Sequence, residues 1–450
     1  MKSGTLIAAV DLGSNSFRLE ISQYDHGQIQ KIAYLKETVR LGSGLDHERN
    51  LTEDAMQRGL ACLARFHERL SGLDKNCVRV VATQTLREAK NRDAFIKQGS
   101  EILGFPIEVI AGTEEARLIY QGVSKLLPPS DEHRLVIDIG GRSTELILGQ
   151  RLKATKTQSF RVGSVAWSLK YFADGHLTEQ TLSRAEIAAQ AVLEEGLISY
   201  AAPNWDMAYG ASGTVGAVAD ILTLAGWSPG VIEIEGVRWL RNCLLRAGHT
   251  KYLNFAGLKE DRRPVIGGGV AVLHALMQLL QIDTLNVAQG ALRHGVLFNM
   301  LERSDQAHDT RDTSVTRLAK KFHVDEAQVQ RVKNAANYFY EQMCLSKDER
   351  DIFKQHEHSK RELDWACELH EIGMAVSHSD YHKHGAYILE NADMLGFSMQ
   401  ELHRIGLIIL GHKGKLRKLE QELEHADLVR PLMAMRLAVI LCLSLIHISE

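Results

Sequence analysis

Up to about residue 300, apolar and polar positions follow two different periods along the chain. Short aliphatic runs predict strands, and longer segments with apolar residues at helical spacing predict helices between them. The predicted strands are Leu6–Val10, Phe17–Ser22, Val78–Ala82 and Ile107–Ile110. The predicted helices are Glu53–Leu70 and Arg92–Leu103. Such alternation indicates an α/β fold in which helices cover a mostly parallel or mixed sheet.

The pattern changes near residue 305. Beyond it the strand signal disappears, long amphipathic helices dominate, and twelve of the 20 histidines lie between His308 and His447. We therefore expect a separate all-α domain over residues 306–441. Residues 442–450 end an apolar helix without a cap, and we expect this tail to be foreign to the native protein.

The α/β part contains an internal repeat. The segment Asp11–Leu19 recurs as Asp138–Leu146, and the two copies share Asp, Gly, Ser and Leu at matching offsets after an apolar strand. A repeat at this spacing predicts two domains of similar topology that face one another, over residues 1–128 and 129–305.

Each copy of the repeat contains a small Gly/Ser loop that closes a strand. Such a loop presents several backbone N–H groups in one concavity, which binds phosphate oxygens without a lysine. A third loop of this kind follows Met207–Tyr209, and each loop taken alone could equally be a tight turn. The candidate phosphate-binding residues are Gly13, Ser14, Asn15, Ser16, Gly140, Gly141, Arg142, Ser143, Thr144, Gly210, Ser212, Gly213 and Thr214.

Three acidic residues accompany these loops. Asp11 and Asp138 end the two strands, and Glu145 lies on the strand that returns from the second loop. Hard oxygen ligands beside bound phosphates suit Mg²⁺, which keeps several waters and bridges phosphate groups. The alternatives are Asx-turn carboxylates for the two aspartates and a solvated strand residue for Glu145.

Two further side chains have a functional and a structural interpretation. Glu115 follows Gly112 in the first turn of a predicted helix, where acids usually complement the helix dipole. Arg87 follows the strand around Val80 and is either an anion ligand or a surface arginine.

Composition excludes some classes of partner. With 53 basic and 56 acidic residues the net charge is −3, so the whole molecule has no attraction to nucleic acid. The six scattered cysteines form no CxxC pair, which favours a reducing compartment over a disulfide framework. We interpret the longest uncharged stretch, Val265–Ile282, as a glycine loop and a buried helix, with no membrane span. No signal peptide is visible, and we expect the protein in the cytoplasm.

Taken together, these residues resemble the exopolyphosphatase/guanosine pentaphosphate phosphatase (Ppx/GppA) family, closest to its long bacterial exopolyphosphatases. The resemblance covers Ala9 to about Ile440. The motifs that carry it are Asp11–Phe17, Thr85–Arg87, Gly112–Ile119, Asp138–Leu146, Gly210–Thr214 and Gly290–Arg293.

The resemblance implies two actin-like domains of the ribonuclease H-like superfamily, with the substrate in the cleft between them. It implies Glu115 as the catalytic base, Arg87 as a phosphate contact, and Asp138, Glu145 and Asp11 as Mg²⁺ ligands, with a monovalent cation such as K⁺ as a further cofactor. Arg142 stands where the family usually has a small residue, Arg18 where it has histidine and His294 where it has glutamate.

The implied activity is hydrolysis of terminal phosphate from inorganic polyphosphate by a homodimer. Hydrolysis of guanosine pentaphosphate (pppGpp) is the alternative with the same motifs. From other classes, a kinase of the same superfold and a non-catalytic polyphosphate sensor remain open.

The helical third resembles an HD-type phosphohydrolase domain through Leu369–Gly373 and His384–Leu389. There Glu371 replaces the metal-ligating aspartate, so we expect packing, dimerisation or substrate guidance in place of a second metal centre. A basic run, Lys413, Lys415, Arg417 and Lys418, is either a polyanion contact or a solvated face.

Overall fold

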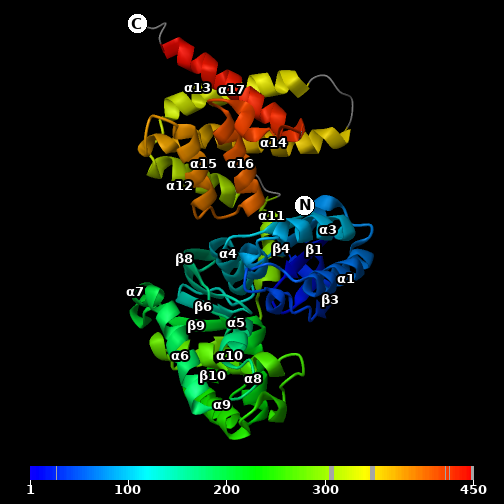
Figure 1. Ribbon diagram of the computed structural model, residues 1–450, viewed down its shortest axis with the longest axis vertical. Helices are drawn as coiled ribbons and strands as arrows, with labels where there is room; N and C mark the ends of the chain where they lie inside the picture. The colour runs from blue at the N-terminus through cyan, green and yellow to red at the C-terminus, as the bar shows by residue number, and fades with distance from the viewer. Residues whose placement is uncertain (27, 304–308, 345–349, 421, 425, 447–450) are drawn as a thin grey trace. The chain divides into compact units, whose positions relative to one another are not determined.

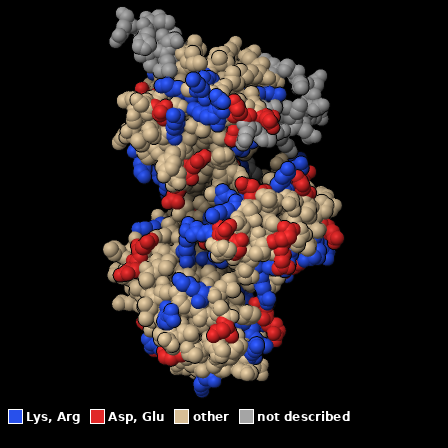
Figure 2. All heavy atoms as spheres, in the orientation of Figure 1, with Lys and Arg blue, Asp and Glu red and all other residues tan. Residues whose placement is uncertain are grey.

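The chain forms two compact units, the first up to Gln306 and the second from Ala307. The structure, a computed structural model, describes residues 1–26, 28–303, 309–344, 350–420, 422–424 and 426–446 (Figure 1). On the face shown in Figure 2, basic and acidic side chains are interspersed over each unit, as the balanced composition suggests. All six cysteines are free, so none forms a disulfide.

The first half of the first unit is built on a five-stranded sheet with the order β3-β2-β1-β4-β5. β1, β2 and β3 are antiparallel neighbours, and β4 and β5 extend the other side of β1 in parallel. The strands are β1 (Thr5–Leu12), β2 (Phe17–Asp25), β3 (Gln28–Glu37), β4 (Val78–Ala82) and β5 (Ile107–Val109). The helices that follow them include α1 (Glu53–Leu70), α2 (Gln84–Glu88), α3 (Arg92–Leu103) and α4 (Gly112–Ser124).

The second half repeats this arrangement. Its sheet has the order β10-β11-β9-β6-β7-β8, so β8-β7-β6-β9-β11 matches the first sheet strand for strand, and β10 is added at the edge. The strands are β6 (His133–Ile139), β7 (Thr144–Gln150), β8 (Lys153–Phe160), β9 (Met207–Ala211), β10 (Val231–Glu233) and β11 (Thr284–Val287). The helices include α5 (Ser164–Tyr171), α6 (Glu179–Leu193), α8 (Ser212–Leu224), α9 (Ile234–Ala247) and α10 (Ile266–Leu279).

The sequence predicts a glycine loop at the start of the stretch Val265–Ile282, and this prediction is wrong. Gly267–Gly269 lie in the first turn of α10. A Cβ on Gly268 would lie 2.5 Å from the carbonyl oxygen of Ser164, so the glycine lets α10 approach the backbone of α5. Tertiary packing therefore offsets the weak helix propensity of this run.

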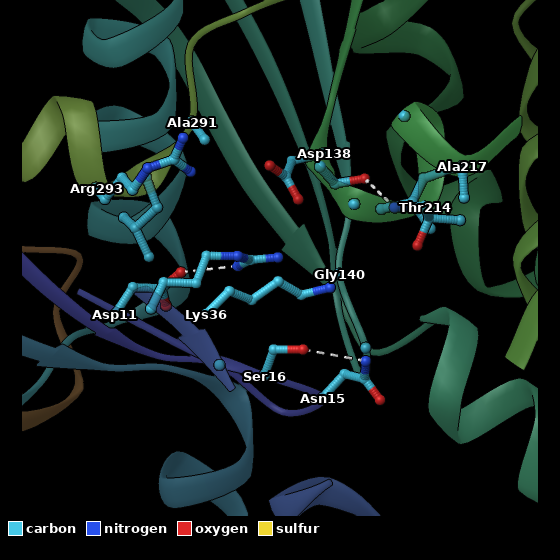
Figure 3. Close-up of a pocket in the computed structure, with 18 of the residues that line it drawn as sticks. Asp11, Asn15, Ser16, Lys36, Asp138, Gly140, Thr214, Ala217, Ala291 and Arg293 are labelled. Atoms are coloured by element: carbon cyan, nitrogen blue, oxygen red, sulfur yellow. Dashed lines mark hydrogen bonds and ion pairs between the residues drawn. The ribbon is translucent and has the colours of Figure 1, made fainter. Parts of the chain in front are cut away.

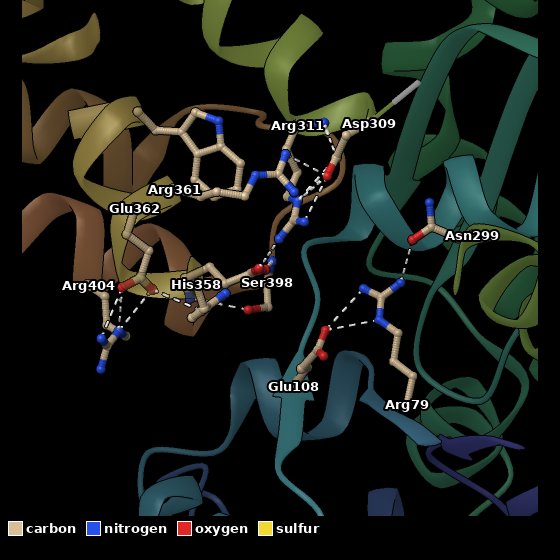
Figure 4. Close-up of polar contacts among 12 residues, drawn as sticks. Arg79, Glu108, Asn299, Asp309, Arg311, His358, Arg361, Glu362, Ser398 and Arg404 are labelled. Carbon is tan, nitrogen blue, oxygen red and sulfur yellow. Dashed lines mark hydrogen bonds and ion pairs between the residues drawn. The ribbon is translucent and has the colours of Figure 1, made fainter. Parts of the chain in front are cut away.

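Two helices join the halves of the first unit. α11 (Leu292–Arg303) lies against α4, and one apolar cluster includes both helices and residues of both sheets. The backbones of α4 and α11 touch at this point. A Cβ on Gly295 would lie 1.8 Å from the carbonyl oxygen of Leu118. Arg79 of β4 adds a polar tie, donating to Asn299 of α11 at 2.6 Å and to Glu108 of β5 (Figure 4).

The second unit is helical throughout its described residues. Its helices are α12 (Thr310–Lys321), α13 (Glu326–Cys344), α14 (Arg350–Leu369), α15 (Tyr381–Asn391), α16 (Met399–Gly411) and α17 (Ala426–Ile446). A buried ionic network runs through it, in which Arg311 binds Asp309 and Glu401, and Arg404 binds Glu362 (Figure 4).

No helix in the described part of the chain is long and apolar enough to cross a membrane. Of the tail expected to be foreign, residues 442–446 continue α17, and residues 447–450 lie outside the described residues.

Candidate functional site

Three Gly/Ser loops of the first unit surround one pocket of about 320 Å³, within the size range of small-molecule sites. They follow β1, β6 and β9, so the two halves of the repeat contribute opposite walls (Figure 3). The predicted residues that line the pocket are Asp11, Gly13, Ser14, Asn15, Ser16, Glu115, Asp138, Gly140, Gly141, Ser143, Ser212, Gly213 and Thr214.

The first two loops touch one another. A Cβ on Gly141 would lie 2.9 Å from Cβ of Ser14, so glycine is required for this approach. Ser14 is held from its own domain as well, because the Thr85 hydroxyl donates to Ser14 Oγ at 2.8 Å. Packing therefore orders the two loops that we expect to bind phosphate wherever they lie against one another.

The third predicted loop is a direct junction, in which β9 ends at Ala211 and α8 begins at Ser212 in a strained conformation. Ser212 has a φ of 95°, which is unusual for a residue with a side chain, and it is the first residue of α8. Its hydroxyl oxygen accepts hydrogen bonds from the amides of Thr214 and Val215 at 3.1 and 3.2 Å, which leaves its own proton free to donate.

Five predicted site residues are not among those that line the pocket. Arg87, Arg142 and Glu145 bind other side chains, described below. The Thr144 hydroxyl donates to the carbonyl oxygen of Val162 at 2.6 Å, and Gly210 is buried against Leu285. Contact of these five with a substrate stays a prediction.

The carboxylates of the site occupy equivalent positions in the two repeats. On the first sheet Asp11 pairs with Arg18, whose Nη1 donates to Asp11 Oδ2 at 2.9 Å. On the second sheet Asp138 pairs in the same register with Glu145, so an acid stands where the first repeat has a cation. Side chains paired in this way lie about 5 Å apart, and the second repeat therefore concentrates negative charge.

Glu115 completes this acidic cluster from the first turn of α4. Gly112 makes its position possible, since a Cβ there would lie 2.5 Å from Cβ of Ser159 on β8. The Ser159 hydroxyl donates to Glu145 Oε1 at 2.7 Å, so α4, β7 and β8 meet at this point. Ser159 belongs to no motif, and the sequence did not indicate it.

The neighbouring acids Glu114 and Glu115 have different surroundings. Glu114 is fully buried and receives two hydrogen bonds of 2.8 Å from Arg117, whereas Glu115 lines the pocket. Arg87 Nη1 donates to Glu115 Oε2 at 2.7 Å and to the carbonyl oxygen of Ile110 at 2.8 Å. The structure therefore places Glu115, and not Glu114, where it can meet a ligand.

Burial and mutual repulsion raise the pKa values of these acids. Burial raises the pKa of Glu115, although the Arg87 guanidinium opposes the shift. Burial and then Glu115 raise the pKa of Asp138 to about 7. Burial, Glu115 and Asp138 raise the pKa of Glu145 well above its usual value. Clustered carboxylates with raised pKa values favour binding of a cation, which would remove the repulsion.

A Mg²⁺ ion at these acids would need waters and substrate phosphates as further ligands. No three His, Cys, Asp or Glu side chains among the described residues are grouped to enclose a metal ion on their own. Mg²⁺ commonly binds through one or two carboxylates, waters and substrate phosphates, which is the arrangement that Asp138 and Glu145 can serve.

Basic side chains that were not among the predicted site residues extend the pocket beyond the acids. They are Arg18, Lys36, Lys259, Arg262 and Arg293. Lys36 extends into the pocket from β3, and its ammonium lies 2.9 Å from Asp261 (Figure 3). The one aromatic residue of the lining is Tyr34, whose ring is covered by the Arg293 guanidinium at 4.9 Å.

In the second unit the HD-like residues form a buried histidine cluster. The rings of His370 and His412 are 5.6 Å apart, and their Nδ1 atoms bond to the carbonyl oxygens of Cys367 and Ile409. Burial lowers the pKa of His370 to about 4, and burial with His370 lowers that of His412 to about 3. Lys413, Lys415, Arg417 and Lys418 are exposed, and the Lys413 ammonium lies 4.6 Å from the centre of the Tyr381 ring.

Known proteins share this sequence pattern and this fold. The model of the Ppx/GppA phosphatase family matches residues 20–304, and that of Ppx/GppA phosphatase domain III matches residues 310–448. An exopolyphosphatase from Cytophaga hutchinsonii is similar with a TM-score of 0.61 and 24% identity over 66% of this chain and 98% of that one. An Aquifex aeolicus PPX-GPPA enzyme is similar with a TM-score of 0.54 and 25% identity over 65% and 98%. The matches confirm the predicted fold class, two actin-like domains followed by a helical domain.

Proposed function

Because the chain belongs to the Ppx/GppA phosphatase family, we propose that it is an exopolyphosphatase, which hydrolyses the terminal phosphate of inorganic polyphosphate and releases orthophosphate. One observation supports this substrate above others. The pocket joins an acidic cluster to five basic side chains and includes a single aromatic ring.

The basic lining suits a ligand that is charged along its length. Polyphosphate carries negative charge on every phosphate, and Arg18, Lys36 and Arg262 can each neutralise part of it. A guanine base would need a flat apolar surface to stack on. Tyr34 offers one, but the Arg293 guanidinium already covers it, which favours polyphosphate over pppGpp.

The residues divide the reaction between them. The Gly/Ser loops hold the terminal phosphate through backbone and hydroxyl donors, and Glu115 orients a water opposite the leaving oxygen and accepts its proton. Arg87 keeps the Glu115 carboxylate in place through the 2.7 Å hydrogen bond. Such positioning, with charge stabilisation, provides most of the acceleration in phosphoryl transfer.

Mg²⁺ would be held by Asp138 and Glu145, with Asp11 facing them, and when bound it supplies positive charge to the phosphate oxygens. Asp11 is already paired with Arg18, so it would bind Mg²⁺ less directly than Asp138 and Glu145.

The deciding experiment measures phosphate release from long-chain polyphosphate and from pppGpp side by side, with and without Mg²⁺. We expect the higher kcat/KM on polyphosphate and no release after chelation. Preference for pppGpp would assign the alternative activity. Release that requires an acceptor other than water would indicate a kinase, and binding without release would indicate a sensor.

A further inference from the structure

A continuous chain of hydrogen bonds connects Arg142, on the loop after β6, to Glu115. Arg142 comes from the second sheet domain, and its guanidinium crosses to the first. Its Nε and Nη2 donate to Glu88 Oε2 at 3.1 and 2.7 Å, and its Nη1 donates to the carbonyl oxygen of Gly42 at 2.9 Å. Glu88 is the last residue of α2, so three hydrogen bonds join the two domains at this point.

From Glu88 the chain continues along α2. Gln84 Nε2 donates to Glu88 Oε1 at 2.6 Å, and Gln84 Oε1 accepts from Nε and Nη2 of Arg87 at 3.0 and 2.7 Å. Arg87 Nη1 then donates to Glu115 Oε2 at 2.7 Å. Arg142, Glu88, Gln84, Arg87 and Glu115 are thus linked with no gap.

The chemistry of these groups fixes the direction of the chain. Arg87 can only donate, and Glu88 only accepts while it is ionised. The Gln84 amide must therefore present its oxygen to Arg87 and its nitrogen to Glu88. Turning the amide over would place two donors together at Arg87 and two acceptors together at Glu88, which is costly at a half-buried site.

We propose that Arg142 is a positioning residue, which sets the orientation of the Arg87–Glu115 pair only when the phosphate loop of the second domain lies against the first. This inference rests on the proposed function, since it assigns Glu115 as the base. Neither Arg142 nor Glu88 nor Gln84 lines the pocket, so their effect on the reaction passes through Arg87.

Separation of the two loops would break the bonds of Arg142 to Glu88 and Gly42. Glu88 would lose its cation, so its carboxylate would hold the Gln84 amide less firmly. Arg87 would then be oriented less firmly against Glu115. Because polyphosphate binds both loops, its binding would favour the closed arrangement and set the base at the same time.

The test compares the parent with Arg142→Ala, Glu88→Ala and the double variant on a short polyphosphate. We expect each single variant to lower kcat about 10- to 100-fold with KM changed less than about threefold, as for a slightly misplaced catalytic group. The double variant should be no worse than either single one, since both break the same chain. Arg142→Lys should recover part of kcat. Arg151→Ala, which removes an exposed ion pair to Asp131, is the matched control and should behave as the parent.

A readout without turnover separates this inference from the proposed function. The Glu115 carboxyl stretch, identified by infrared difference against Glu115→Gln, gives the pKa of Glu115 directly. We expect Arg142→Ala to raise it, because a loosened Arg87 no longer favours the carboxylate. A raised pKa in a protein that hydrolyses no polyphosphate would sustain the coupling and overturn the function. An unchanged pKa with unchanged kcat, or a loss confined to KM, would overturn the coupling.

Discussion

At the residue scale, the site depends on which neighbouring side chains bind two adjacent glutamates. Glu114 is enclosed with Arg117, and Glu115 faces the pocket beside Arg87. Both acids lie in the first turn of α4. The packing of that turn decides which of them faces the pocket.

Glu115→Gln should lower turnover by about 10²- to 10⁴-fold, the usual contribution of a general base. Binding of the substrate should change little, because the amide keeps the shape of the side chain. Glu114→Gln should instead lower the melting temperature and keep kcat in the folded fraction, since it weakens a buried ion pair. Steady-state kinetics and thermal unfolding of both variants test the assignment, which fails if the two effects are exchanged.

Mg²⁺ binding should release a proton at neutral pH. The pKa of Asp138 is raised to about 7, so part of the Asp138 population is protonated there and must ionise to bind a cation. Affinity for Mg²⁺ should therefore rise with pH through about 7 and fall below it. Calorimetric titration with Mg²⁺ in two buffers of different ionisation enthalpy measures the released proton, and Asp138→Asn should weaken binding and reduce the release to the part that Glu145 contributes. Identical heats in both buffers would exclude this linkage.

The residues that sequence motifs identify are those whose backbone is constrained, such as the glycines of the loops. Lys36, Lys259 and Arg262 line the same pocket but come from segments without a motif, so only the fold brings them together. The place of Arg142 in its loop predicts a phosphate contact, which stays a prediction, and the bond of its guanidinium to Glu88 was not predicted. The length of a side chain and its available partners are not visible in a motif.

At the scale of elements, periodicity predicted α1, α3 and β4 with the bounds that the structure shows. These elements have an apolar face or a buried run that their residues alone define. The prediction failed at Gly267–Gly269, where contact with α5 makes a glycine run helical. A local sequence pattern does not show which elements approach one another closely in the fold.

Gly112 makes such an approach at the start of α4. Gly112→Ala should displace the first turn of α4 from β8 and lower kcat more than stability, because that turn carries Glu115. The neighbouring change Ser159→Gly removes the atoms in the way, at the loss of one hydrogen bond to Glu145. The double variant should therefore have a higher kcat than Gly112→Ala alone. If it is no more active, steric displacement is not the reason for the loss.

At the scale of the whole molecule, the repeat Asp11–Leu19 and Asp138–Leu146 predicted two sheets of one topology, which the strand orders confirm. The repeat also shows where the copies have diverged. Arg18 pairs with Asp11 in one sheet, and Glu145 pairs with Asp138 in the other. Arg18 thereby neutralises Asp11 in the first sheet, whereas Asp138 in the second sheet has a second acid beside it.

The helical unit should lose stability as the pH falls from about 6.5 toward 4. His370 and His412 are buried as neutral rings with pKa values of about 4 and 3, so the unfolded chain binds their protons first. Stability is then full above the unfolded pKa and decreases below it. Amide exchange in α15 and α16, corrected for its intrinsic pH dependence, should report the change. His370→Gln should make the decrease shallower, and an equal slope in parent and variant would exclude this cause.

The glycine contact between α4 and α11 has a mechanical consequence. Helices whose backbones touch at Gly122 and Gly295 cannot slide past one another, but they can turn, so the contact serves as a pivot. Glu115 lies seven residues before Gly122, which makes a lever arm of about 10 Å along α4. A rotation of only about 10° would move the carboxylate by about 2 Å, a distance at which an oriented water is gained or lost. A small turn of α4 against α11 would thus change the position of Glu115 far more than the contact itself.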